Sequence, residues 1–485
     1  MAPSTSTRSS LPPPTFASLG VRTLINCRGT YTVLTGSRAL NTVAEAMRAA
    51  SDGYVVMDEL MEAVGRRQAE LTGAEWGYVS SGCAAALTEV AAACIAGADP
   101  EKMARLPDTA GMPDEVIIQA AHRNSNDRAM RAAGARMVEV VTPAHLHAAL
   151  SERTALIAVI GDQAHLGEIP VQAMIEAGRA RGIPVLVDAA AERPDVPNLY
   201  LGMGADAVAY SGGKCLRGPQ ASGLVLGRRD LLWAAWLHGA PHHGVARPMK
   251  AGKEEIMGLL AAVEAWVLGR DHAAEWRAWE ECLAHIAAAV ESFASVTTEV
   301  ILPGIANVTP TLRITWDAAT LGITPDEAHR ALDAGEPRIA LHLVPGGLLV
   351  NPYMMEAGED RLAAARLREV LALGRPGAGA GAPGVGVDAS GEWLVEAAFV
   401  RGTARYGLTL RQEGAALRGV LRTRYESVEV SGEVAGRAVT LRAQLGYQSN
   451  RTGYTFTGTL GEDGTLRGAL DCGEFGSAEW GARRP

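Results

Sequence analysis

The sequence lacks paired cysteines, an excess of basic residues and any long apolar run. None of the cysteines stands at C-x-x-C spacing, so neither a zinc site nor a disulfide framework is predicted. We expect no bound metal, and reduced thiols typical of a cytoplasmic protein. The cysteines are Cys27, Cys83, Cys94, Cys215, Cys282 and Cys472.

No apolar stretch reaches the roughly 20 residues needed to span a bilayer. Residues 1–14 are polar and rich in proline, without the apolar core of a signal peptide. The net charge is −9, whereas nucleic acids and anionic membranes need a basic surface. The sequence therefore predicts a small-molecule ligand, and neither a nucleic-acid nor a membrane partner. With 485 residues, 48% of them hydrophobic, it is long enough for two or three domains.

What the sequence does contain is an unusual stretch from Gly204 to Gly227. An apolar run predicts a strand over 207–210, and it ends at Ser211-Gly212-Gly213-Lys214. Two glycines let the backbone bend sharply and approach a ligand closely. A second apolar run follows at 223–226. Lys214 is thus expected on a glycine turn between two buried strands.

Upstream, the apolar run 183–187 predicts another buried strand, and it ends on Asp188. Taken alone, a strand-end Asp is usually a cap and a single Lys is usually solvated. Lys214 follows Asp188 by 26 residues, however, and both lie at strand ends. This is the layout of an enzyme carrying pyridoxal 5'-phosphate (PLP), with Lys214 forming a Schiff base and Asp188 pairing with the pyridine nitrogen.

The string SGGK-x-x-x-GPQ-x-SG and its surroundings resemble the fold-type I PLP-dependent enzymes. Within them the chain is similar to the branch around bacterial selenocysteine synthase and D-glucosaminate-6-phosphate ammonia-lyase. The similarity covers roughly residues 20–375 and includes INCRGTYTVLTGSRAL and LTGAEWGYVSSGCAAAL upstream and ARPMKAGKEEIMGLLAAVEAW downstream. It implies an α/β fold with a mainly parallel sheet and helices on both faces, followed by a smaller α+β domain.

The resemblance also implies which residues hold PLP. The turn before the helix at 83–96 corresponds to the phosphate-binding turn of the family, although an ordinary helix cap is the plain alternative. His122 corresponds to the residue that stacks on the cofactor ring and relays protons, the alternative being a surface histidine. The implied cofactor-binding residues are Ser81, Gly82, Cys83, His122, Asp188, Ser211, Gly213 and Lys214.

Four residues are expected to contact the substrate. Arg123 and Gln163 follow strands of the predicted parallel sheet, whose carboxyl ends face the ligand site. Arg247 lies in a basic loop where anion binding and plain solvation are equally expected, and Arg338 is placed to hold the α-carboxylate. Asp162 is a weaker candidate beside Gln163.

Changes in composition predict five parts of the chain. A disordered tail over 1–20 precedes the N-terminal arm and large PLP-binding domain over 21–257, and the small α+β domain covers 258–375. A glycine- and proline-rich linker over 376–391 leads to alternating apolar and polar residues over 392–485. That alternation predicts an all-β sandwich or small barrel. Its Leu417-Arg418-Gly419 recurs as Leu466-Arg467-Gly468.

These features predict an enzyme that removes the α-proton of an amino acid or amino-sugar acid. We expect a C–N lyase giving a 2-oxo acid and ammonia, with a racemase or epimerase as the alternative and a non-catalytic PLP-fold protein as a second one. A reaction on tRNA is disfavoured by the acidic charge and by a matching region that begins near residue 22. The family resemblance implies a homodimer, with the arm over 21–40 reaching the active site, often that of the neighbouring subunit.

Overall fold

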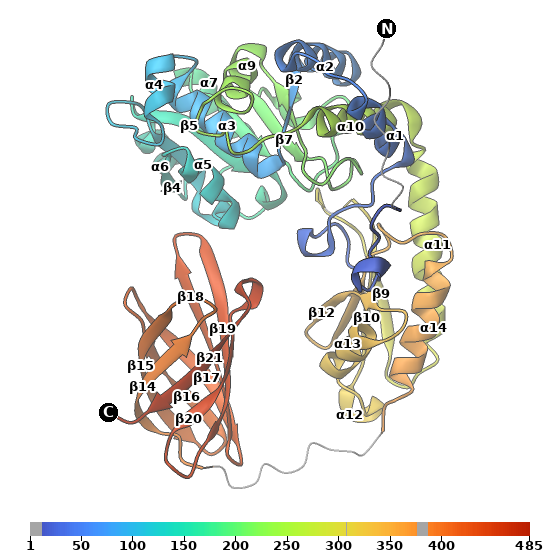
Figure 1. Cartoon of the computed structure of the whole chain (residues 1–485), viewed down its shortest axis with the longest axis vertical. Helices are drawn as coiled ribbons and strands as arrows, with labels where there is room; N and C mark the ends of the chain where they lie inside the picture. Colours follow the sequence, from blue (N-terminus) through green and yellow to red (C-terminus); the bar gives the residue numbers. More distant parts are fainter. Residues whose placement is uncertain (1–11, 307, 376–386) are drawn as a thin grey trace. The chain divides into compact units, whose positions relative to one another are not determined.

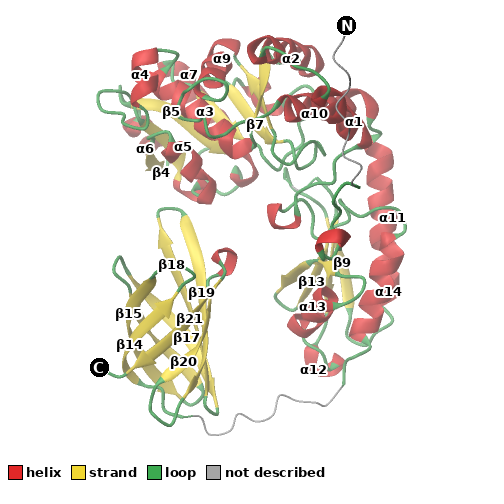
Figure 2. Cartoon of the chain, viewed as in Figure 1, coloured by secondary structure: helices red, strands yellow, loops and turns green. Residues whose placement is uncertain are grey.

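The computed structural model describes residues 12–306, 308–375 and 387–485. The chain divides into two compact units, one holding the α/β part and the other the C-terminal strands. Figure 1 shows both, coloured along the sequence, and Figure 2 distinguishes their helices from their strands. Within the described ranges no helix has the length and apolar character that crossing a membrane requires.

The first unit is built on a seven-stranded sheet with the order β2-β8-β7-β6-β5-β3-β4. Neighbours from β7 to β4 are parallel, whereas β8 is antiparallel to both β7 and β2. The predicted mainly parallel sheet is confirmed. Its strands are β2 (Trp76–Ser80), β3 (Glu115–Gln119), β4 (Arg136–Val140), β5 (Thr154–Ile160), β6 (Val185–Asp188), β7 (Ala207–Ser211) and β8 (Gly223–Gly227).

The central strands are continuous apolar runs because helices cover the sheet. All seven residues of β5 and all four of β6 are buried. Helix α3 packs on β5, β7 and β8, while α7 packs on β5 and β6. The helices of this part are α1 (Asn41–Ser51), α2 (Met57–Thr72), α3 (Cys83–Ala96), α4 (Pro100–Arg105), α5 (Arg128–Ala132), α6 (Pro143–Ala149), α7 (Val171–Arg181), α8 (Leu199–Met203), α9 (Arg229–His238) and α10 (Lys253–Glu264).

A second core in the same unit lies under a four-stranded antiparallel sheet, β12-β13-β10-β9. Helix α11 packs against α14, and the strand β1 of the N-terminal arm pairs in parallel with β11. The elements are β1 (Ile25–Asn26), β9 (Thr297–Ile301), β10 (Thr311–Thr315), β11 (Ile339–Ala340), β12 (His342–Val344), β13 (Gly347–Val350), α11 (His272–Val290), α12 (Ala318–Leu321), α13 (Pro325–Ala334) and α14 (Glu359–Leu371).

Residues of the first core continue along the chain beyond residue 257, where the boundary between the large and the small domain was predicted. Leu259, Val263 and Trp266 all belong to the first core, and beyond them the next residue of the second core is Leu283 on α11. Short helical turns connect several of these elements. They are η1 (Ala17–Leu19), η2 (Thr32–Leu34), η3 (Ala120–His122), η4 (Ser125–Asp127), η5 (Gly161–Gln163) and the π-helical η6 (Ala265–Gly269).

The C-terminal strands close into an eight-stranded antiparallel barrel in sequential order, so of the two predicted all-β forms the barrel is the one adopted. Alternate residues point inward, as in β14, where buried and exposed positions alternate. The barrel comprises β14 (Gly391–Ala398), β15 (Thr403–Glu413), β16 (Ala416–Arg422), β17 (Ser427–Ala435), β18 (Ala438–Tyr447), β19 (Asn450–Leu460), β20 (Leu466–Asp471), η7 (Gly473–Phe475) and β21 (Ser477–Arg483).

The Leu-Arg-Gly repeat falls on equivalent places in β16 and β20. Leu417 and Leu466 are buried in the barrel core. A Cβ on Gly419 would lie 1.9 Å from the carbonyl oxygen of Thr409, and one on Gly468 would lie 1.9 Å from that of Thr457. Each glycine therefore lets the neighbouring strand approach closely.

Two predicted segments lie partly outside the described residues: positions 1–11 of the predicted tail and positions 376–386 of the predicted linker. The rest of that linker belongs to the barrel. Ala389 is fully buried in its core, and β14 begins at Gly391.

The buried carboxyl of Glu89 on α3 makes the stability of the first unit sensitive to pH. Tyr78 donates a hydrogen bond to it at 3.0 Å, but burial raises its pKa from 4.5 to about 8. Because the folded state then holds the proton more tightly, this group's contribution to stability is complete below pH 4.5 and is lost as pH rises through 8.

We predict that Glu89→Gln changes the free energy of unfolding little at pH 5 but raises it relative to the unmodified protein at pH 9, by about 5 kcal/mol. Urea unfolding at the two pH values measures the difference. Glu152→Gln, at an exposed position, is the control. Equal effects of Glu89→Gln at both pH values would contradict the prediction.

Candidate active site

Lys214 lies in a tight turn between β7 and β8. The turn is closed by two backbone hydrogen bonds of 2.8 Å, from Gly212 N–H to the carbonyl of Ser222 and from Gly218 N–H to the carbonyl of Gly212. The carbonyl of Gly213 accepts a bond from the N–H of Ser37 in the arm, at 2.9 Å. The lysine side chain is half-buried, and within the described ranges its ammonium has no hydrogen bond or ion pair. The backbone is thus fixed while the amine stays available.

Asp188 ends β6, which pairs in parallel with β7. Its Oδ1 accepts a bond from the N–H of Ala190 at 3.0 Å and lies 3.4 Å from Sγ of Cys83. Burial raises the pKa of the Asp188 carboxyl, and these two contacts and the charge of Lys214 partly oppose that rise. A buried carboxyl beside a lysine is suited to hold a cationic N–H, which would favour its ionised form.

The start of α3 offers a place for a phosphate. Gly82 precedes the helix with φ +89°, and no side chain caps the first N–H groups. A Cβ on Gly82 would meet nothing within 4 Å, so the space on that side of the turn is open. Ser81 and Gly82 are half-buried, whereas Cys83 is buried against Asp188. Fourteen residues of helix place a positive dipole end here, which favours an anion. Together with Lys214 and Asp188, this set of groups fits PLP.

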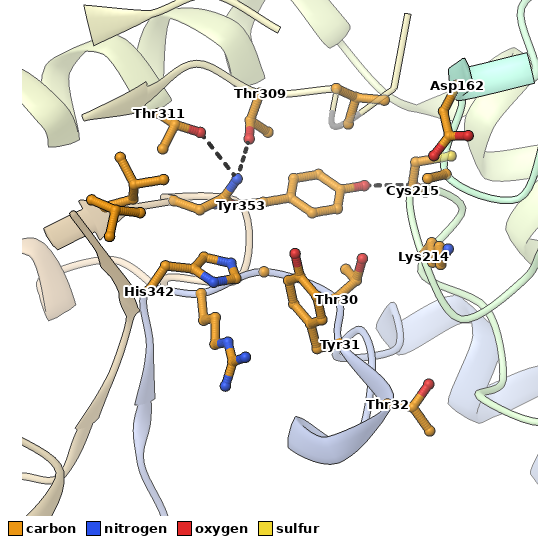
Figure 3. A pocket seen from close by; sticks show the side chains of 17 residues that line it. Thr30, Tyr31, Thr32, Asp162, Lys214, Cys215, Thr309, Thr311, His342 and Tyr353 are labelled. Atoms are coloured by element: carbon orange, nitrogen blue, oxygen red, sulfur yellow. Dashed lines mark hydrogen bonds between the residues drawn. The ribbon is translucent and has the colours of Figure 1, made fainter. Parts of the chain in front are cut away.

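A cavity of about 550 Å³ opens beside Lys214 (Figure 3). Its wall is formed by the N-terminal arm, by turns that follow strands of the seven-stranded sheet (the large part) and by the four-stranded sheet with the residues next to its strands (the small part). The polar residues lining it include Arg28, Thr30, Tyr31 and Thr32 of the arm, Asp162, Lys214 and Cys215 of the large part, and Thr309, Thr311, His342, Asn351 and Tyr353 of the small part.

Side chains from later in the sequence also hydrogen-bond to the lysine turn. The hydroxyl of Tyr353 donates to the carbonyl of Cys215 at 2.7 Å, and the guanidinium of Arg270 donates to the same oxygen at 2.7 Å (Figure 3 shows the tyrosine bond). Arg270 is itself fixed by a pair of bonds to Glu275, at 2.8 and 2.9 Å. Two rigid donors on the residue after Lys214 restrict where its side chain can start.

The residues predicted to bind the cofactor differ in how deeply they are buried. His122, at the end of η3, is fully buried and lies 3.4 Å from Gln119 Nε2 and 3.5 Å from the backbone N of Ile160, so it is not a surface histidine. Burial lowers its pKa, which favours the neutral imidazole. Ser211 is half-buried at the end of β7, and Gly213 is buried against Gln220.

The residues expected to bind substrate are not brought together. Arg123 is ion-paired with Asp127 at 2.5 Å, and Arg338 with Asp333 at 2.8 Å. Among the described residues that line the cavity, neither of these arginines appears, nor do Gln163 and Arg247. Asp162, the weaker sequence candidate, does line it. Asp162 and Gln163 both lie in the short turn η5, and only Asp162 is among the described residues that line the cavity.

Sequence reasoning missed the arm and small-part side chains of the cavity: Arg28, Tyr31, His342, Asn351 and Tyr353. It expected the arm to reach an active site, and residues 28–32 do line the cavity of Lys214 in the same chain. The run Arg28-Gly29-Thr30-Tyr31 was the available signal, a cation and a hydroxyl ring beside a glycine. Over the described residues, no three or more His, Cys, Asp or Glu are grouped as a metal site would need.

Comparison with known proteins supports the geometry. The family model described as Aminotransferase class-V matches residues 105–252. The chain is 30% identical to D-glucosaminate-6-phosphate ammonia lyase of Salmonella typhimurium, over 74% of this chain and 98% of that one. A solved structure of D-glucosaminate-6-phosphate ammonia-lyase superposes with a TM-score of 0.64, covering 74% of this chain and 99% of the other. The chain belongs to this family of PLP-dependent enzymes.

Two further relatives show the breadth of the family. The chain is 32% identical to 5'-C-glycyluridine monooxygenase-decarboxylase of a Streptomyces species, over 73% of this chain and 92% of that one. It is also 28% identical to L-seryl-tRNA(Sec) selenium transferase of Edwardsiella ictaluri, over 51% of this chain and 57% of that one. The predicted fold type and the predicted cofactor, PLP, are confirmed by these family relations. The lyase among the relatives supports the predicted lyase activity.

Proposed function

We propose that the protein is a PLP-dependent C–N lyase acting on a small amino acid or amino-sugar acid. The observation that carries this proposal is that Lys214 lines a cavity of about 550 Å³ and lies close enough to the buried Asp188 for its charge to act on that carboxyl, in a family member with an ammonia-lyase relative. A cavity of this volume accommodates a small organic molecule.

Each residue has a distinct task in this proposal. Bound PLP supplies an electron sink for a negative charge that develops at the substrate α-carbon. Lys214 Nζ would hold the cofactor and, as a free amine, would take the α-proton. Asp188 would bind the pyridine N–H and favour its protonated form. The first N–H groups of α3, with Ser81, Gly82 and Cys83, would hold the phosphate. His122, at the end of η3, is a fully buried ring whose pKa burial lowers, which favours the neutral imidazole.

A second reaction has a specific observation in its favour. The relative that is 32% identical carries a decarboxylase activity in its name, so cleavage of a bond at the α-carbon other than C–H is the alternative to elimination. Racemisation needs the same α-proton step followed by proton return from the opposite face. All three outcomes use Lys214 and Asp188 and differ in the product.

We predict that the PLP-loaded protein releases ammonia and a 2-oxo acid from at least one β-hydroxylated amino acid, whose hydroxyl leaves as water, and that Lys214→Ala abolishes this. The α-proton then has no base at the turn. A panel of D- and L-amino acids is scored separately for ammonia, 2-oxo acid, carbon dioxide and the inverted enantiomer. Carbon dioxide or inverted enantiomer without ammonia would replace the lyase proposal by one of its alternatives. Full turnover by Lys214→Ala would remove the lysine from the reaction.

Asp188→Asn is expected to retain PLP and to lower kcat by at least ~100-fold. An amide cannot stabilise a protonated pyridine nitrogen as a carboxylate does, so the electron sink is weakened. The measurements are kcat and the visible absorbance of the bound cofactor. Asp195→Asn, at an exposed position seven residues downstream, is the matched control. If the Asp188 variant turned over normally, the carboxylate would have no part in the chemistry.

We further propose that the working form is a cytoplasmic homodimer. All six cysteines are free. Exposed apolar side chains gather in the α1–α2 loop, where Tyr54, Val55 and Val56 are 101%, 55% and 59% exposed, and in the arm, where Val33 is 75% exposed. Such groups on a protein surface mark an interaction site.

Sedimentation at micromolar concentration should therefore give a dimer, and Tyr54→Asp with Val56→Asp should shift it towards the monomer. Two carboxylates buried in an apolar contact are costly to desolvate. Replacing the exposed Val400 of the barrel by Asp is the control, because Val400 lies outside this surface. An active monomer before any substitution would overturn the dimer.

A further inference from the structure

The cavity beside Lys214 has two chemically different ends. Lys214 and Asp162 lie at one end, and His342 lies at the other, with Tyr31 between (Figure 3). The far end is formed by the arm and β12, two segments more than 300 residues apart in sequence. The reaction proposed above uses none of the side chains at this far end.

Arg28 brings a positive charge to that far end. Its guanidinium lies 5.0 Å from the centre of the Tyr31 ring, a cation–π contact that fixes its plane. Its Nε is buried and has no hydrogen-bond partner among the described residues. Arg28 forms no ion pair with any of them either, and the one carboxylate lining the cavity, Asp162, stands at the opposite end. A buried guanidinium donor without an acceptor costs free energy until a ligand supplies one.

Arg28 supplies the charge at this end of the cavity, because the rings beside it are neutral. His342 stacks edge-on against Tyr31, with ring centres 4.9 Å apart. Burial and the charge of Arg28 both lower the pKa of His342, so its imidazole is neutral near pH 7. The one N–H of the neutral His342 ring is engaged by the backbone of Arg28. The Tyr31 phenol can donate a hydrogen bond to oxygen, and a guanidinium can bind two oxygens at once.

We propose that Arg28 binds an anionic oxygen group of the substrate, a carboxylate or a phosphate, while the substrate amine faces Lys214. This deepens the proposed function and rests on it, since it names the substrate class as amino acids whose anion reaches the arm. It also makes Arg28 a specificity residue. A substrate without that anion would leave the guanidinium unpaired and bind poorly.

Binding of a simple anion tests the subsite without any turnover. Phosphate and malonate are titrated calorimetrically into the PLP-loaded protein, with Arg28→Gln, Arg28→Lys and Arg48→Gln beside it. Arg48 is an exposed helix arginine paired with Asp52, away from the cavity. We expect Arg28→Gln to weaken binding of at least one anion by tenfold or more, Arg28→Lys to weaken it less, and Arg48→Gln to leave it unchanged. Equal affinities in all four proteins, or no binding by the unmodified one, would overturn the proposal.

Steady-state kinetics then locate the anion on the substrate. An amino acid with a neutral side chain is compared with one bearing a second carboxylate or a phosphate. A rise in KM for both classes in Arg28→Gln assigns Arg28 to the α-carboxylate, and a rise for the doubly anionic class alone assigns it to the distal group. Unchanged KM for both, with a PLP spectrum and thermal unfolding like the unmodified protein, contradicts either assignment.

The two proposals fail in different ways. If no amino acid yields ammonia but anion binding still depends on Arg28, the lyase function is wrong and the anion site stands. If ammonia is released normally while neither anion binding nor KM depends on Arg28, the anion site is wrong and the lyase function stands.

Discussion

The parallel pairing of β6 with β7 is the constraint on which the rest of the site depends. Its register sets Asp188 opposite Ala209, two residues before β7 ends. The carboxyl ends of both strands therefore meet at one edge of the sheet, and the turn that follows β7 returns Lys214 to the same edge. The positive charge of Lys214 is close enough to Asp188 to oppose the rise in pKa that burial causes there. Any slip of one residue between these strands would turn Asp188 into the opposite layer.

Buried polar groups around this edge of the sheet accept hydrogen bonds from donors close by. Behind the cavity wall, Glu192 is 3% exposed and accepts bonds from the Tyr200 hydroxyl at 2.9 and 3.1 Å. Burial raises the pKa of Glu192 to about 7. Its backbone carbonyl also accepts from Sγ of Cys215, the residue after Lys214. The lysine turn is thus bonded to the carbonyl of Glu192 through the thiol of Cys215 and to the hydroxyl of Tyr353 through the carbonyl of Cys215, and Tyr353 belongs to the same core as the seven-stranded sheet.

The large fold and the positions of Asp188 and Lys214 at strand ends could be predicted from the sequence because both rest on local patterns. Apolar runs that end on Asp188 and on the glycine turn before Lys214 define strand ends without reference to distant residues. The barrel was foreseeable from alternation in the same way, but its closure was not, since pairing of β14 with β21 joins segments about 80 residues apart. Arg123 and Arg338 were expected at the substrate because an arginine suits a carboxylate, yet Asp127 and Asp333, four or five residues away, already pair with them. Such local partners decide whether an arginine remains available.

The opposite case is Arg28, which has no Asp or Glu within five residues on either side in the sequence and no carboxylate at its end of the cavity. Its neighbours are the Tyr31 ring and a neutral His342. An arm that only anchored the small part would gain more from an apolar side chain here, because a half-buried guanidinium must be desolvated without compensation. The β1–β11 pairing and the burial of Ile25 and Cys27 already provide that anchoring. The charge is therefore explained by what enters the cavity rather than by what holds the arm.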